Sequence, residues 1–359
     1  MVDTEHPAGW RNRLAMERRD VLRLLSGTLL AGSLPAGRAF AEDGELVVQN
    51  WGGAAEKAVL AGFAEPTKAV TGRTLVVDGS GSMAGKVKAM VEAKHVTVDI
   101  MDLPLGDGTQ LGQAGLLEDI DYTIVDKSKV PDGFTTQWGI ASYLFSYIFA
   151  VNEKRAKDKI PKTWADFWNT KDFPGKRGLP GYSQGVWEAA LLADGVPPDQ
   201  LYPLDLDRAI RKIKEIKPNA VFWKTGAQSE DLLRQGEVMA SLMWSNRAAI
   251  VRRNLKTISW GWDGAILVAS AWSAPKGNPA GRKAAMEFIN LALDPKGQAT
   301  VFSVVGMSPS NPAANALIPA EDQPFNAAAH TEKQVKLSDA WYAKHADEAE
   351  AMYIQAISS

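Results

Sequence analysis

The stretch SYLFSYIFAVN, residues 142–152, decides the fold. It is an apolar run without a charge, which is typical of a strand buried on both faces of a sheet. A second such run, GAILVASAWSAP, follows at residues 264–275. Strands that lead directly into helices flank each run, the pattern of parallel sheets covered by helices on both faces. The sequence therefore predicts an α/β protein whose chain passes twice between two α/β units.

The order of strands and helices also predicts where a ligand binds. In open α/β sheets, ligands bind beyond the carboxyl ends of the strands. The helix that begins after Gly52 and Gly53 is expected to stop before Pro66, because proline interrupts helical hydrogen bonding. The loops that we expect to line a pocket directly follow strands, at residues 50–54, 104–109, 181–187, 244–247 and 306–309.

Composition excludes several classes of protein. The 359 residues carry a formal net charge of −2, without the basic surplus of a nucleic-acid-binding protein. The sequence has no cysteine, so disulfides, thiol nucleophiles, thiolate metal sites and lipoprotein acylation are ruled out. The four histidines, His6, His95, His330 and His345, include no pair at ligand spacing. Asp99 and Asp102 are interpreted as strand-end polarity, and we expect neither a metal nor a cofactor.

The first 41 residues form an export signal. ERRDVLRLLSGTLLAGSLPAGRAFA, residues 17–41, has a basic region, a short apolar core and a small-residue end at Ala39–Ala41. The pair Arg18–Arg19 resembles a twin-arginine signal, although Glu17 precedes it. We therefore expect removal of residues 1–41 and a periplasmic location.

One motif suggests an enzyme. GYSQG, residues 181–185, satisfies the nucleophile-elbow pattern of α/β-hydrolases, with Ser183 as the nucleophile. A triad also needs a histidine after that serine, and His330 and His345 both lie in polar surroundings. The same turn can bind an anion without chemistry, because backbone N–H groups at a helix start are free to donate.

Several segments together resemble the periplasmic binding proteins of the spermidine/putrescine type, which serve ABC importers. PKTWADFWNTKDFPGKRGLP (161–180) looks like that family's signature region. The segments that agree with it in order are GLLEDIDYTIVDKSKV (115–130), FAVNEKR (149–155), RQGEVMASLMWSNRAA (234–249) and NLALDPKGQATVFSVVGMSPSNP (290–312). The resemblance covers nearly all of the chain after the signal.

The resemblance implies a type II binding-protein fold, with a ligand cleft between two lobes that two crossing strands join. Lobe 1 is expected at residues 42–147 plus 270–317, and lobe 2 at residues 148–269 plus 318–359. An inner-membrane ABC permease and ATPase are the implied partners. We expect a monomer, without a nucleic-acid partner.

At the positions that bind the ligand in that family, this sequence has only some of the family's residue types. Trp51 and Trp244 match aromatic positions, and Met307 stands where the family has another aromatic. The acidic residues that grip polyamines are replaced by Tyr182, Gly185 and Ser270, which argues against a polyamine ligand. Arg247 stands where polyamine binders have a small residue, and a guanidinium suits a ligand carboxylate. Pairing of Arg247 with Asp263 or Glu230 is the alternative.

These observations favour a binding protein for a small carboxylate, one that can also carry an amine, over an enzyme. Trp51 and Trp244 are expected to flank the apolar part of the solute, and Asp107 to meet an amine. Arg247, Asn246, Tyr182, Ser183 and Gln184 are expected to hold the acid. The remaining predicted ligand-binding residues are Gly53, Trp187, Ser270 and Met307. A polyamine-binding protein and a serine hydrolase built on Ser183 are the alternatives.

Overall fold

A computed structural model describes residues 44–358 of the chain. The predicted export signal, residues 1–41, lies outside the described residues. Its removal and its twin-arginine character therefore stay predictions. Within the described part, strands and helices alternate much as the sequence indicates, and short 3-10 helices occupy several of the connections.

The strands form one mixed sheet. They are β1 (Glu45–Gln49), β2 (Thr74–Asp78), β3 (Ile100–Pro104), β4 (Ile140–Asn152), β5 (Arg177–Pro180), β6 (Ala220–Trp223), β7 (Ala240–Trp244), β8 (Ile258–Ser259), β9 (Ile266–Ser273), β10 (Ser308–Pro309) and β11 (Val335–Lys336). The order along the sheet is β2-β1-β3-β9-β4-β7-β5-β6; β8 and β10 pair with β4, and β11 pairs with β9.

The helices cover both faces of this sheet. They are α2 (Ala54–Thr71), α3 (Ala84–Glu92), α4 (Leu105–Gln113), α5 (Glu153–Ala156), α6 (Trp164–Trp168), α7 (Val186–Ala193), α8 (Leu206–Ile216), α9 (Gly226–Gln235), α10 (Ser245–Asn254), α11 (Gly281–Leu291), α12 (Pro295–Val305) and α13 (Asp339–Ser358).

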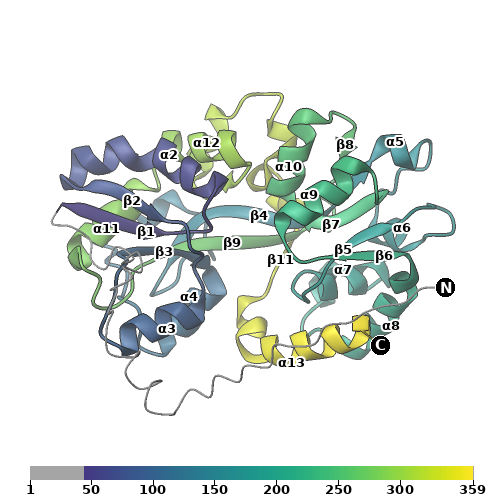
Figure 1. The fold of residues 1–359 in the computed structure, drawn as a ribbon, viewed down its shortest axis with the longest axis horizontal. Helices are drawn as coiled ribbons and strands as arrows, with labels where there is room; N and C mark the ends of the chain where they lie inside the picture. The colour runs from purple at the N-terminus through teal and green to yellow at the C-terminus, as the bar shows by residue number, and fades with distance from the viewer. Residues whose placement is uncertain (1–43, 359) are drawn as a thin grey trace, which may run out of the picture. The chain divides into compact units, whose positions relative to one another are not determined.

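The two apolar runs are the strands at the centre of the sheet. β4 and β9 run antiparallel to each other, with Tyr143 opposite Ser270 and Tyr147 opposite Ile266. Parallel strands lie on either side: β2, β1 and β3 in what we call the first lobe, and β7, β5 and β6 in the second (Figure 1). This arrangement confirms the predicted α/β fold with two crossing strands. The residue limits expected for the two lobes stay a prediction.

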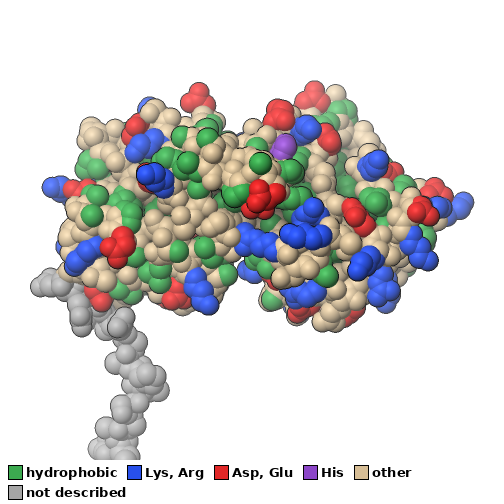
Figure 2. Space-filling model, turned by 90° about the horizontal axis from the view of Figure 1, so that it is seen from above, with side chains coloured by type: hydrophobic (Ala, Val, Ile, Leu, Met, Phe, Trp, Pro, Cys, Tyr) green, Lys and Arg blue, Asp and Glu red, His purple; other side chains and the backbone are tan. Residues whose placement is uncertain are grey.

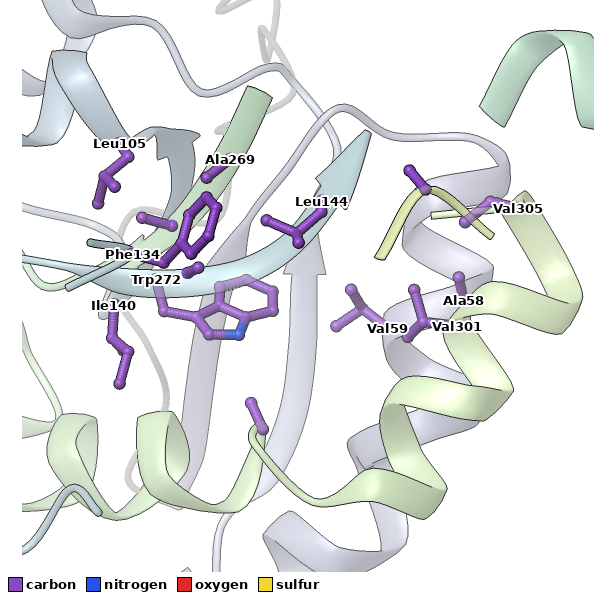
Figure 3. Close-up of a cluster of buried hydrophobic side chains, with 14 of the residues drawn as sticks. Ala58, Val59, Leu105, Phe134, Ile140, Leu144, Ala269, Trp272, Val301 and Val305 are labelled. Carbon is purple, nitrogen blue, oxygen red and sulfur yellow. The ribbon is translucent and has the colours of Figure 1, made fainter. Parts of the chain in front are cut away.

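Packing against the sheet explains why these segments fold where they do. Along β4, Leu144 and Ile148 join one apolar cluster, while Tyr147 and Phe149 join another, because alternate side chains of a strand face opposite sides. In Figure 3, Val59 of α2 and Val301 of α12 lie beside the crossing strands. Both faces of β4 are therefore buried, as its composition predicted.

One expected boundary was wrong. α2 continues through Pro66 to Thr71 and ends at Gly72, which has a left-handed φ of 71°. Gly62 explains the continuation, because a Cβ there would lie 2.8 Å from the carbonyl oxygen of Gly297 in α12. Close packing of α2 on α12 thus outweighs the helix-breaking tendency of one proline.

Figure 2 shows acidic and basic side chains spread over the visible face of the molecule. That distribution agrees with the small net charge of the sequence. Among the described residues, no helix is both long and apolar enough to cross a membrane.

Candidate functional site

One face of β4 carries a row of aromatic side chains that joins the two lobes. Tyr143, Phe145 and Tyr147 alternate along the strand and therefore point the same way. The Tyr143 hydroxyl donates to Asp102 of β3, in the first lobe. The Tyr147 hydroxyl donates to Gln184 Oε1 over 3.1 Å, in the second. The row thus spans the region where the sequence predicts the ligand.

Trp244 and Tyr182 lie together at the second-lobe end of this row. Their ring centroids are 6.2 Å apart, and the Trp244 ring is 5.7 Å from Trp223 and 6.4 Å from Phe145. Trp244 Nε1 and the Tyr182 hydroxyl are both buried beside the Tyr147 hydroxyl, and neither makes a hydrogen bond of ordinary geometry with residues 44–358. Burial is the main cause that raises the pKa of Tyr182 well above its usual value, so this hydroxyl keeps its proton and can donate.

Arg247 is not the unpaired cation that the sequence suggested. Its Nη1 donates to Glu230 Oε1 of α9 over 2.9 Å, and Glu230 also pairs with Arg234 over 3.1 Å. The alternative of an internal acid partner is therefore the one that the structure shows. The pairing leaves Arg247 Nε buried without a partner. The guanidinium packs tightly on Gly226, where a Cβ would lie 2.6 Å from Nε.

The turn before α7 is also occupied from within the chain. The backbone N–H of Ser183 donates to Glu350 Oε2 of α13 over 2.8 Å. That N–H is therefore not free for a ligand anion, contrary to expectation. Gly185 has a φ of 79°, and a Cβ there would lie 2.5 Å from the Tyr147 ring. The tyrosine ring thus fills the space that a larger residue at position 185 would need.

Trp187 lies in the core of the second lobe. It is fully buried, and its ring meets Tyr353 of α13 edge to face, with centroids 5.6 Å apart. Sequence reasoning placed it in a pocket loop, but it lies in the first turn of α7 on the side that packs against α13. We leave it out of the candidate site.

Two loops that the sequence predicts at the pocket lie around Trp51 and Met307. Trp51 is 48% exposed at the tip of a turn, which Asn50 Oδ1 stabilises by accepting from the N–H of Gly52 over 2.8 Å. Gly53 allows the chain to enter α2 with a φ of 58°. Gly306, just before Met307, packs against the backbone of Asn246, where a Cβ would lie 3.3 Å from the Asn246 oxygen. The 244–247 and 306–309 loops therefore meet.

Asp102 is a residue that sequence reasoning misjudged. Its side chain is buried, with the residue only 1% exposed, and it accepts from Ser270 Oγ over 2.5 Å and from Tyr143. It also lines a cavity together with Asn50 and Met307. Its neighbour Asp99 is structural, because it accepts from the backbone N–H groups of Val47 and Ala280. The sequence did contain a signal for a buried polar residue, since Asp102 is the single charged residue in the apolar strand IMDLP.

Burial raises the pKa of Asp102 to about 6, although its hydroxyl donors act in the opposite direction. The folded state then holds this proton more tightly than the unfolded chain. The free energy of unfolding should therefore fall as pH rises from about 4 to about 6, by about 2–3 kcal/mol from this group.

In Asp102→Asn, we expect the free energy of unfolding to lose this dependence on pH. Urea unfolding at pH 4.5 and at pH 7 measures that free energy for both proteins. The pKa of Asp339 is also raised to about 6 by burial and by Asp107. Asp339 remains in both proteins, so the difference between them isolates Asp102. An unchanged pH dependence in the variant would refute this assignment.

Asp107 has no described contact with the aromatic row. It stands in the first turn of α4, where burial raises its pKa, and it interacts with Asp339 at the start of α13. No described contact joins it to Trp51 or Trp244. Its expected role toward an amine stays a prediction.

The hydrolase interpretation gains no support from the histidines. His330 stacks on Trp262 with ring centroids 5.5 Å apart, and His345 stacks on Trp341 at 4.8 Å. No described contact joins either histidine to Ser183. Within residues 44–358 there is also no group of three or more histidine, aspartate or glutamate side chains placed to hold a metal ion.

Comparison with known proteins identifies the family. The family model for bacterial extracellular solute-binding proteins matches residues 62–332. The chain belongs to this family. The solute-binding protein is 29% identical to the gamma-aminobutyric acid-binding protein of Pseudomonas aeruginosa, over 81% of its own chain and 84% of that relative.

Solved structures agree with this assignment. The structure of the Atu4243-GABA receptor is 36% identical, with a TM-score of 0.82, and the match covers 87% of this chain and 97% of that one. The spermidine/putrescine-binding protein PotD of Streptococcus pneumoniae is 18% identical, with a TM-score of 0.70, over 87% and 98% of the two chains; this likeness shows the fold alone.

The family and the similar solved structures establish the general role of this protein. The solute-binding protein is the substrate-binding component of an ABC importer and has the two-lobed periplasmic-binding-protein fold. Proteins of this family bind substrates and are not enzymes. They act outside the cytoplasm, which implies a periplasmic location, and they work with a membrane permease and an ATPase.

Proposed function

We propose that the solute-binding protein captures a small amino acid in which the carboxylate and the amine are well separated, of the class of gamma-aminobutyric acid (GABA). One observation supports the position that we assign to the carboxylate of the solute. Tyr182 Oη, Trp244 Nε1 and Arg247 Nε are buried near the carboxyl ends of β5 and β7, none makes a hydrogen bond of ordinary geometry with residues 44–358, and the first two lie beside the Tyr147 hydroxyl. Unpaired buried donors are costly, and the oxygens of a carboxylate would satisfy them.

The aromatic side chains suit the middle of such a solute. Trp244 and Tyr182 provide apolar ring surface at the second-lobe side. Trp51, half exposed, is available from the first lobe. A short methylene chain between these rings would bury apolar surface without a polar partner. The two relatives that bind GABA support this class of solute.

We assign the amine end to Asp102. It contacts Ser270 and lies with Met307 around one cavity, and both of these residues were expected in the site from the sequence. No cation is paired with Asp102 among the described contacts, so its negative charge attracts an ammonium group from a distance, without a direct hydrogen bond. Contacts to both lobes at once can form only when the lobes are close together, which would couple binding to closure.

A thermal-shift screen tests the class of solute. At 100 times its dissociation constant, a ligand adds about 2.7 kcal/mol of stability, or about 5 °C for a protein of this size. We expect GABA and its close homologues to give such a shift, and putrescine and spermidine to give none. A shift with the polyamines alone would reject the proposal in favour of the polyamine alternative.

A fluorophosphonate probe addresses the enzyme alternative. An unactivated serine is a poor nucleophile, so we expect Ser183 to remain unlabelled under conditions that label a serine hydrolase completely. Intact-protein mass spectrometry measures the labelling. Stoichiometric modification of Ser183 would show that an activated nucleophile had been missed.

A further inference from the structure

The cavity beside Asp102 is lined by residues whose side-chain N–H donors make no hydrogen bond within residues 44–358. Asn50 and Trp272 are 0% and 1% exposed, both line the cavity, and Asn50 Nδ2 and Trp272 Nε1 lack partners. The orientation of the Asn50 amide is fixed, because its oxygen accepts from Gly52. Two residues with unsatisfied buried N–H donors and one residue with a buried carboxylate therefore line the same small cavity.

Most of the wall around these polar groups is apolar. Val59 of α2 and Val301 of α12 line the same cavity as Trp272, and Figure 3 labels all three side chains. The cavity volume is about 10 Å³. That volume is close to the lower limit for a single water and too small for a carboxylate or a methylated group.

The polar groups of the lining further restrict which molecule the cavity can bind. A metal cation would meet the N–H donors of Asn50 and Trp272 with the wrong polarity. A water can accept from both donors and donate to a carboxylate. Asp102 accepts from three hydroxyls, those of Ser142, Tyr143 and Ser270, and a carboxylate has about four acceptor sites. One site on Asp102 therefore remains for a proton of the water.

We propose that this cavity binds one ordered water, which accepts from Asn50 Nδ2 and Trp272 Nε1 and donates to Asp102. The water connects three elements of the first lobe: the turn that carries Trp51, strand β3 and the crossing strand β9. Through this water, the Trp51 turn, β3 and β9 are joined in one hydrogen-bonded network. This inference does not depend on which solute the protein binds.

A crystal structure of the ligand-free protein at about 1.5 Å resolution tests the site directly. The expected result is a full-occupancy water 2.7–3.2 Å from both nitrogen atoms and within the same range of an Asp102 oxygen. An empty cavity would overturn the proposal. So would a water that contacts only one of the two donors.

A matched pair of variants gives an independent test in solution. Trp272→Phe and Trp187→Phe each remove a fully buried indole whose Nε1 has no hydrogen-bond partner in the part of the chain that the structure describes. Each keeps a ring at an edge-to-face contact. Only Trp272 lines the cavity. We expect Trp272→Phe to have a Tm about 2 °C below that of Trp187→Phe, because one more hydrogen bond is lost.

Equal Tm values, or a higher Tm for Trp272→Phe, would contradict the proposal, because removing an unpaired donor should then be neutral or favourable. If Trp272→Phe fails to fold, the crystal structure of the unaltered protein still decides the question.

Discussion

Trp244→Ala should weaken the binding of GABA by at least about 100-fold. The substitution removes the ring that covers the methylene chain and the Nε1 donor that we assign to the carboxylate. Losing ring contact costs about 1–2 kcal/mol, and losing a hydrogen bond to a charged group about 1.5–3 kcal/mol. The sum of about 2.5–5 kcal/mol starts close to the roughly 2.7 kcal/mol of a 100-fold change. Isothermal titration calorimetry at neutral pH measures the dissociation constant.

Two further variants separate the parts of this effect. Trp244→Phe keeps an aromatic surface and loses the donor, so we expect a weakening of about 10-fold. Trp223→Phe changes a neighbouring ring whose Nε1 already donates to the Leu242 carbonyl, and it should lower stability but leave affinity within about threefold. Unchanged affinity in Trp244→Ala would show that the solute binds elsewhere.

Arg247→Gln should also weaken GABA binding, by about 10- to 150-fold. Arg247 Nε is a buried donor without a partner, and its charge would favour a bound carboxylate even though Nη1 is engaged by Glu230. A charge-assisted hydrogen bond contributes about 1.5–3 kcal/mol, which corresponds to this loss of affinity. Calorimetry with GABA again gives the measurement.

Arg234→Gln is the matched control for that prediction. Arg234 pairs with the same carboxylate, Glu230, and also with Asp231 on the surface of α9. If Arg247 only served to neutralise Glu230, the two variants would change affinity equally. We expect Arg234→Gln to bind GABA as the unaltered protein does, and equal losses in the two variants would reject a ligand role for Arg247.

The fold was largely predictable because its strongest signals are local. The strands β4 and β9 were visible as long runs without charge, and strand-helix alternation indicated the parallel pairs on either side of them. The error at Pro66 has a different origin. The continuation of α2 depends on its contact with α12, and Gly62 and Gly297 are separated by more than 200 residues in the sequence.

The site was less predictable, because the hydrogen-bond and ion-pair partners of its residues come from distant segments of the chain. Pairing of Arg247 with Glu230 depends on how α9 and α10 lie beside each other. The Ser183 N–H is occupied by Glu350, which is 167 residues away on α13. The residue types alone could not show that the chain itself satisfies these groups. The aromatic positions Trp51, Tyr182 and Trp244 were easier to predict as candidates, since each lies at the end of a strand or two residues beyond it.

A crystal structure of the protein with GABA tests the central claim most directly. We predict that the GABA carboxylate lies within about 3.2 Å of Tyr182 Oη, Trp244 Nε1 and Arg247 Nε, with the methylene chain against the Trp244 ring. The ammonium group should point toward Asp102 in the first lobe. A carboxylate bound elsewhere, with these three donors still unpaired, would contradict the account.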